Sequence, residues 1–231
     1  MPRVPGIRES SFRLLALIAG ASACASAWSV ELTVVASGGA QPLADAVFSL
    51  ESTAAAASPS VAATRAVMDQ RGSQFVPRVL AVRAGTAVAF PNSDQIQHQV
   101  YSFSATKRFE LPLYAGKQVG PIRFDQPGVA VLGCNIHDWM IGYVVVVDTP
   151  YFGKTDAQGR LVLDAPPGNY RLQAWHERQT GGVAVREVAL LAGKPQSLSI
   201  PLSVKAEAPA RAGNDRLKAL QEKFRRIKPT P

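Results

Sequence analysis

The sequence is poor in residues that bind metals or attack substrates. Its 231 residues include two cysteines, three histidines and three methionines, and only 18% of the residues are charged. With so few thiols, the chain cannot be a scaffold stapled by several disulfides. Glycine (18) and proline (17) are instead plentiful, and short valine-rich runs lie between them. This pattern favours an all-β protein over a helical bundle.

Residues 1–27 have the features of a secretory signal peptide. Arginines precede the apolar run 14–23, and Ala-Ser-Ala follows at 25–27. The apolar run is too short to span a bilayer. We therefore expect export to the periplasm with cleavage after Ala27. Anchoring as a lipoprotein through Cys24 is the alternative.

Cleavage at that point would leave Cys134 as the single thiol, so no internal disulfide could form. An exported protein works in an oxidising compartment, where an exposed thiol would be oxidised or would link two chains. Cys134 is therefore expected to be either buried and inert or held as a thiolate by a metal.

The basic charge is concentrated near the C-terminus. Residues 204–231 contain eight lysines and arginines against three acidic residues, whereas residues 28–203 carry a net charge of about +1. The high isoelectric point thus belongs to a tail, and we expect no nucleic-acid partner. Apolar residues at helical spacing over 214–227 predict a short amphipathic helix. We expect it to pack or fray, with contact to an anionic membrane as the alternative.

Strand signals run through the rest of the chain. Residues 30–52 have the pattern of two strands around a Gly-Gly turn, and 65–90 contain short alternating strands. Residues 142–148 are apolar without alternation, which predicts a strand buried on both faces. Residues 155–175 predict a hairpin, a Pro-Pro-Gly turn and a further strand.

One short segment places Cys134, His137 and Met140 three residues apart. A thiolate, two imidazoles and a weak axial thioether form the His₂Cys site that suits copper electron transfer. His98 lies 36 residues before Cys134, after a loop rich in Pro, Asn and Asp, and is the candidate for the second imidazole. The sequence therefore predicts one copper ion bound by His98, Cys134, His137 and Met140.

Each of these residues also has an ordinary explanation when taken alone. A lone histidine is more often a strand residue, a lone methionine more often core, and a lone cysteine usually a small buried hydrophobe.

A Cys134–His137 nucleophilic pair would instead make an enzyme. Such a dyad needs an orienting third group and an oxyanion site, which are hard to build in so tight a loop. We therefore predict that the protein is not an enzyme.

The Cys-x-x-His-x-x-Met segment, followed by Gly142 and a valine-rich strand, resembles the cupredoxins, and the amicyanin-like blue copper proteins most closely. Residues 79–94 (VLAVRAGTAVAFPNSD) are similar to the cupredoxin signature that leads to the first histidine ligand. The resemblance implies a Greek-key cupredoxin β-sandwich over 60–148, the four copper ligands above and a protein redox partner. Exported plastocyanin-like proteins named for methylamine utilisation have a similar loop.

Residues 155–175 resemble a second family, the carboxypeptidase regulatory-like β-sandwich, a small immunoglobulin- or prealbumin-like module. The stretch 38–50 (GGAQPLADAVFSL) is similar to the hairpin with which that family begins. We therefore expect residues 28–58 to join 149–203 in one discontinuous sandwich, with the copper domain inserted. The alternative assigns residues 30–52 to the copper domain. The third histidine, His176, is expected at the surface or between the domains.

Three functions follow from these patterns. The first is a periplasmic electron carrier with a mononuclear type 1 copper site. The second is a copper carrier or sensor without electron traffic. The third is a non-redox extracytoplasmic β-sandwich that acts as a binding module.

Overall fold

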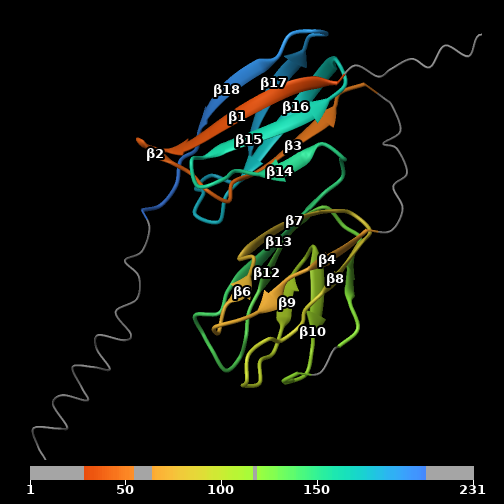
Figure 1. The fold of residues 1–231 in the computed structure, drawn as a ribbon, viewed down its shortest axis with the longest axis vertical. Coiled ribbons are helices and arrows are strands. Elements are labelled where there is room, and N and C mark those ends of the chain that lie inside the picture. Colours follow the sequence, from red (N-terminus) through yellow and green to blue (C-terminus); the bar gives the residue numbers. More distant parts are fainter. Residues whose placement is uncertain (1–28, 55–63, 117–118, 207–231) are drawn as a thin grey trace, which may run out of the picture.

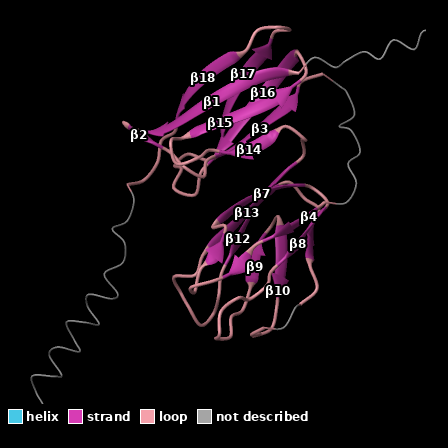
Figure 2. Ribbon diagram, viewed as in Figure 1, coloured by secondary structure: helices cyan, strands magenta, loops and turns pink. Residues whose placement is uncertain are grey.

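The computed structural model describes residues 29–54, 64–116 and 119–206. Within these ranges the chain forms eighteen strands and no helix (Figure 2). The all-β class predicted from the sequence is therefore confirmed. In the same ranges no helix is long and apolar enough to cross a membrane. The predicted signal peptide at 1–27 and the predicted tail helix at 214–227 lie outside the described residues.

The strands form two sandwiches, at the upper and lower ends of Figure 1. We call residues 29–54 and 149–206 the flanking sandwich, and residues 64–116 and 119–148 the central sandwich. The flanking sandwich contains β1 (Val30–Gly38), β2 (Gln41–Pro42), β3 (Val47–Ser52), β14 (Phe152–Lys154), β15 (Arg160–Ala165), β16 (Gly168–Trp175), β17 (Ala184–Leu190) and β18 (Gln196–Pro201).

The flanking sandwich joins segments that are far apart in the sequence. One sheet has the order β15-β1-β18, with β2 paired to β1, and the other has the order β14-β3-β16-β17. β1 pairs antiparallel with β15 and parallel with β18. β3 pairs antiparallel with β14 and β16. The strands on either side of the central sandwich in sequence therefore pair with one another.

Alternation in β1 and β3 explains why these segments form the flanking core. Leu32 and Val34 on β1, and Phe48 and Leu50 on β3, are 0% exposed and belong to one apolar cluster. The predicted turn exists at Gly39, where φ is +66°, but it joins β1 only to the short β2. β3 lies in the opposite sheet, paired with β14 and β16, and Leu43 between β2 and β3 is buried in the core of the flanking sandwich.

The central sandwich contains ten strands. They are β4 (Arg65–Val67), β5 (Asp69–Gln70), β6 (Phe75–Val76), β7 (Val79–Arg83), β8 (Thr86–Ala89), β9 (Tyr101–Ser104), β10 (Lys107–Glu110), β11 (Ile122–Phe124), β12 (Gly128–Leu132) and β13 (Gly142–Val147). The two three-stranded sheets have the orders β11-β8-β4 and β12-β13-β7. Phe90, Phe124 and Val144 are 0–1% exposed in the core between them, which also contains Cys134 and Met140.

β13 is buried on both faces, as its unalternating valines predict. Val144 and Val146 point into the central core. Val145 and Val147 belong to a second cluster that includes Val47 of the flanking sandwich. The flanking sandwich therefore covers the outer face of the sheet that contains β12 and β13. The Cys134 loop, residues 133–141, connects these two strands.

Candidate metal centre

The segment that leads to His98 is shaped by the side chain of Asn92. The Asn92 amide nitrogen donates hydrogen bonds to the carbonyl oxygens of Ile96 (2.9 Å) and Tyr114 (2.7 Å). Its amide oxygen accepts one from the backbone N–H of Asp94 (3.0 Å). An asparagine side chain can satisfy several backbone groups in this way, so the turn holds a fixed shape. His98 then forms two backbone hydrogen bonds with Tyr114, each 3.0 Å long.

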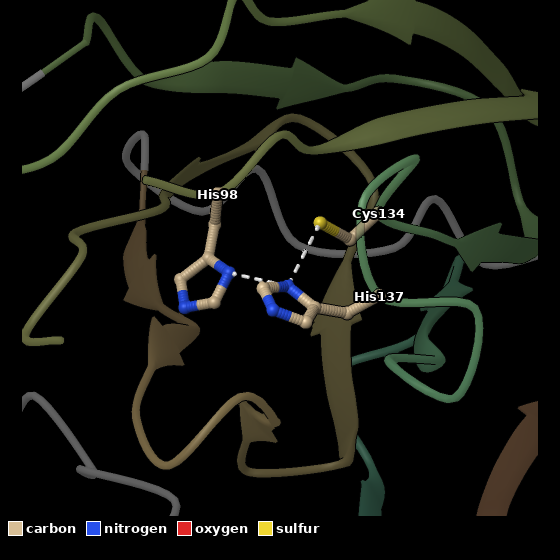
Figure 3. A group of neighbouring side chains, drawn as sticks. All are labelled: His98, Cys134 and His137. Atoms are coloured by element: carbon tan, nitrogen blue, oxygen red, sulfur yellow. Dashed lines mark hydrogen bonds between the residues drawn. The ribbon is translucent and has the colours of Figure 1, made fainter. Parts of the chain in front are cut away.

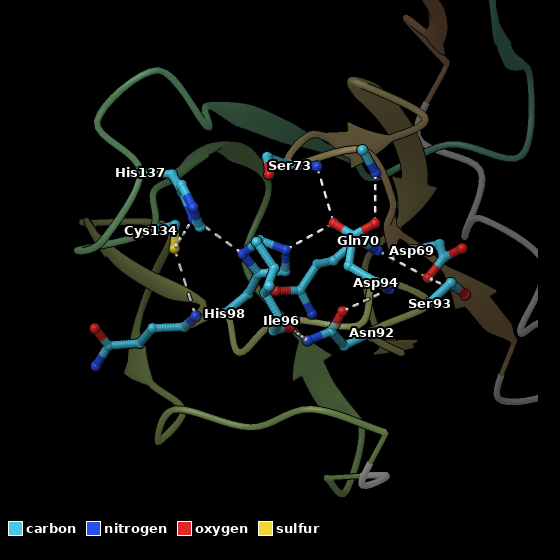
Figure 4. A network of polar contacts seen from close by, with 12 residues as sticks. Asp69, Gln70, Ser73, Asn92, Ser93, Asp94, Ile96, His98, Cys134 and His137 are labelled. Atoms are coloured by element: carbon cyan, nitrogen blue, oxygen red, sulfur yellow. Dashed lines mark hydrogen bonds and ion pairs between the residues drawn. The ribbon is translucent and has the colours of Figure 1, made fainter. Parts of the chain in front are cut away.

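Asp94 orients the His98 ring. Its Oδ2 lies 2.7 Å from His98 Nε2, and its two carboxylate oxygens accept hydrogen bonds from the backbone N–H groups of Gly72 and Ser73 (Figure 4). These contacts lower the pKa of Asp94, the bond from Ser73 contributing most. An ionised Asp94 places the proton of a neutral His98 on Nε2, which leaves the Nδ1 lone pair free for a metal.

Cys134 follows directly after a bridge between two strands of the central sandwich. Gly133 exchanges two backbone hydrogen bonds with Tyr101, of 3.0 and 3.1 Å. The Tyr101 ring occupies the place where a side chain on residue 133 would lie, because a Cβ there would stand 2.6 Å from its atoms. Cys134 is 3% exposed, and its sulfur accepts the backbone N–H of Gln99 at 3.5 Å. Such a bond stabilises a thiolate.

Figure 3 shows His98, Cys134 and His137 pointing toward one another. Their donor atoms all lie within 4.8 Å. The two Nδ1 atoms of His98 and His137 are 3.1 Å apart, and Cys134 Sγ is 3.9 Å from His137 Nδ1. The structure thus brings together one histidine from an upstream loop and two residues from the Cys134 loop.

Two of these spacings match those expected around a single small metal ion. Ligand bonds of about 2.0 Å to nitrogen and about 2.3 Å to sulfur, at trigonal or tetrahedral angles, separate the donors by about 3 to 4 Å. Two of the three observed spacings, 3.1 and 3.9 Å, fall in this range, and the three donors together lie within 4.8 Å of one another. The donor set of two imidazoles and one thiolate suits copper. Within the described residues this is the one cluster of three His, Cys, Asp or Glu side chains with metal-binding geometry.

Met140 is buried beside this group. It is 1% exposed, lies in the same core cluster as Cys134, and donates its backbone N–H to the carbonyl of His137 at 2.9 Å. This bond closes the loop into a tight turn and returns Met140 to the core. Its role as the axial ligand stays a prediction.

The accessible side of the site lies at His137 and Trp139. The Trp139 ring packs edge-on against the His137 ring, with 5.1 Å between centroids, and is 55% exposed. Ile136 (50%) and Ile141 (37%) are exposed nearby in sequence. A surface depression of about 470 Å³ borders the same loop, and its lining includes Cys134 and Met140. The segment from Cys134 to Ile141 therefore presents to solvent both apolar side chains and, at Asn135 and Asp138, polar ones.

His176 is remote from this cluster in its interactions. It follows β16 in the flanking sandwich, is 5% exposed, and its Nδ1 accepts the backbone N–H of Arg178 at 3.2 Å. Burial lowers its pKa. Its contacts are those of a residue that shapes a turn.

The residue that sequence reasoning missed is Asp94. Its spacing of four residues from His98 within a turn-rich loop was the available signal.

Asp94→Asn keeps the size of the side chain but removes its charge, and outer-sphere partners of this kind are worth about 10–100-fold in metal affinity. We expect copper affinity to fall by about this factor, measured by chelator competition.

Asp69→Asn is the matched control for this measurement. Asp69 Oδ1 accepts hydrogen bonds from Gln70 N–H and the Ser93 hydroxyl in the neighbouring loop, and no hydrogen bond joins it to His98. Equal affinities for the Asp94→Asn, Asp69→Asn and unmodified proteins would show that Asp94 does not act on the metal through His98.

Comparisons with known proteins give structural similarity alone. No protein-family model and no curated protein matches the chain. Among solved structures, the purple cupredoxin of Nitrosopumilus maritimus shares 24% identity, with 36% of this chain and 99% of that chain covered and a TM-score of 0.32. An amicyanin variant in its reduced Cu(I) form shares 23% identity, with 43% and 98% covered and a TM-score of 0.34.

A third similar structure is the copper-containing nitrite reductase of Thermus scotoductus SA-01. It shares 24% identity, with 50% of this chain and 28% of that chain covered, and a TM-score of 0.34. The chain is thus similar to cupredoxins over part of its length.

Proposed function

We propose that the protein binds one copper ion through His98, Cys134, His137 and Met140 and carries electrons in the periplasm. The observation that carries the proposal is the convergence of two imidazole Nδ1 atoms and one buried thiol sulfur within 4.8 Å. We also propose that the copper domain is residues 60–148, inserted into a sandwich formed by 28–58 and 149–203. The pairings of β1 with β15 and β18, and of β3 with β14 and β16, support this division.

Copper would supply one-electron chemistry at this site by alternating between Cu(I) and Cu(II). The protein's own contribution is a fixed donor set. Asp94 holds the ring of His98 in place, the Gln99 N–H holds the sulfur of Cys134, and the Met140 N–H closes the loop. Donors that move little between two oxidation states keep the reorganisation energy of electron transfer low.

The route to a redox partner runs through His137. This ligand is half-buried, whereas His98 is 0% exposed, so His137 is the imidazole nearest to solvent. The exposed side chains of Ile136, Trp139 and Ile141 lie along the same loop. Together with the exposed polar side chains of Asn135 and Asp138, they form a mixed surface around a partly exposed ligand, which suits brief docking with a redox protein.

An enzyme based on Cys134 and His137 is the less suitable function, and we propose that the protein is not an enzyme. Cys134 is 3% exposed, so the thiol is poorly placed to attack a substrate. His137 Nδ1 also faces His98 Nδ1 at 3.1 Å, which places a second imidazole where the dyad would need a reacting group.

The test is a Cu(II) titration of residues 28–231, read by visible absorption and electron paramagnetic resonance and followed by voltammetry. We expect an intense thiolate-to-copper band that saturates at one equivalent, and a reversible one-electron couple. Rapid loss of copper to chelators, without a reversible couple, would favour a carrier or sensor. Failure of the folded protein to bind copper would reject both and leave a β-sandwich binding module.

A further inference from the structure

The guanidinium of Arg78 connects the metal loop to the flanking sandwich. Arg78 lies between β6 and β7, and its Nη1 donates a hydrogen bond to the carbonyl oxygen of Ile141 at 3.3 Å. Its Nε lies 2.9 and 3.1 Å from the two carboxylate oxygens of Glu177, and its Nη2 lies 2.8 Å from one of them. One side chain therefore touches both sandwiches.

The position of Ile141 makes this contact relevant to the proposed copper site. Ile141 follows Met140 directly, and its N–H is bonded to the carbonyl of Trp139 at 3.1 Å. Its carbonyl is thus the last backbone group of the loop before β13 begins at Gly142. A hydrogen bond at this carbonyl holds the end of the segment that carries Met140.

An aromatic ring of the central sandwich, itself packed against a ring of the flanking sandwich, lies beside the same guanidinium. It lies 5.8 Å from the centroid of the Tyr143 ring, and Tyr143 packs against Trp175 of the flanking sandwich at 5.4 Å. An arginine over an aromatic face is attracted by the negative face of the ring. The hydrogen bond with Glu177 raises the pKa of Arg78, so its charge is permanent. The guanidinium is therefore constrained from several directions.

Glu177 is itself held in a defined turn. The backbone N–H of His176 donates to the side-chain oxygen of Gln179 at 3.0 Å, and the N–H of Gln179 donates to the His176 carbonyl at 2.9 Å. The Glu177 side chain is 20% exposed, whereas that of Arg78 is 49% exposed. Of the two partners, the carboxylate is the more firmly placed, and it directs the guanidinium toward Ile141.

We propose that the flanking sandwich positions the end of the metal loop through the series Glu177–Arg78–Ile141 and thereby influences the copper site. This inference rests on the proposed copper function. It assigns Arg78 and Glu177 as positioning residues and gives the flanking sandwich a role beyond packing. A partly exposed ion pair adds little to folding stability. Its removal should therefore alter the loop while leaving the fold intact.

The test compares Glu177→Ala with the unmodified protein, and uses Glu187→Ala as the control. Glu187 is also a flanking-sandwich carboxylate near an arginine, Arg171 at 3.9 Å, but it is 70% exposed and is bonded to no loop residue. In the copper-free proteins we expect the Met140 and Ile141 amides to exchange with deuterium about tenfold faster in Glu177→Ala. In the copper-loaded proteins we expect Glu177→Ala to lose copper to a chelator about tenfold faster. We also expect its electron paramagnetic resonance spectrum to differ from that of the unmodified protein.

The two proposals fail separately in this experiment. If the unmodified protein binds no copper, the proposed function is wrong, and the amide exchange of the copper-free proteins still decides the loop contact. If Glu177→Ala matches the unmodified protein in amide exchange, chelator kinetics and spectrum, the positioning role is overturned. Equal changes in amide exchange and copper loss in Glu177→Ala and Glu187→Ala would overturn it too. The changes would then follow from removing any carboxylate of the flanking sandwich, and not from the contact with Arg78.

Discussion

Replacing Cys134 with serine is expected to abolish the intense visible band of the copper-loaded protein. The band requires a thiolate bound to copper, and a serine hydroxyl does not ionise at neutral pH. Loss of a direct ligand should weaken copper binding by more than the about 10–100-fold typical of outer-sphere partners. Spectral titration measures the first effect and chelator competition the second.

Serine is nearly the same size as cysteine, so the 3%-exposed site should fold around it. Met68→Leu is the control, because Met68 is a 0%-exposed member of the same core cluster and its sulfur lies outside the predicted ligand set. We expect this variant to keep the band. An unchanged band in Cys134→Ser, in protein whose thermal unfolding is cooperative, would show that the thiol is no ligand and would reject the type 1 site.

Replacing Phe48 with alanine is expected to lower the free energy of unfolding by about 3–5 kcal/mol. Phe48 on β3 is 0% exposed in the flanking core, and truncation of a buried phenylalanine removes apolar contacts and leaves a cavity. Denaturant unfolding of the copper-free protein measures the loss. We expect the copper band to persist in the folded variant, because Phe48 belongs to a different cluster from Cys134.

Phe103→Ala deletes the same atoms from β9 at a side chain that is 65% exposed, and it should change stability by no more than about 0.5 kcal/mol. A Phe48→Ala cost as small as that of Phe103→Ala would mean that β3 adds little to the flanking core. The division of the chain in which residues 28–58 join 149–203 would then lose its main energetic support.

The candidate donor residues could be picked out from the sequence because cysteine, histidine and methionine are scarce in it. The chain has three histidines and two cysteines, so Cys134, His137 and Met140 at equal spacing leave few other sets of residues that could bind a metal. The loop rich in Pro, Asn and Asp before His98 indicates which histidine supplies the second imidazole. The orienting role of Asp94 could not be predicted with the same force. Aspartate is common in turns, and only folding brings its carboxylate within 2.7 Å of His98 Nε2.

The valines of β13 show how far local pattern reaches. An unalternating run predicts burial on both faces, and Val144–Val147 are all buried. The pattern does not say what covers the outer face. Here Val47 and Trp175 of the flanking sandwich pack near it, and they come from segments about 100 and 30 residues away.

By itself, the sequence determined the all-β class, the candidate donor set and the doubly buried strand, because these depend on residue type and on spacing over a few positions. Only the tertiary structure decided that β1 and β3 lie in opposite sheets, that Asp94 faces His98, and that Arg78 joins Ile141 to Glu177. These arrangements depend on the course of the turns and on the order of strands in each sheet. Both are set by how the whole chain packs its two cores.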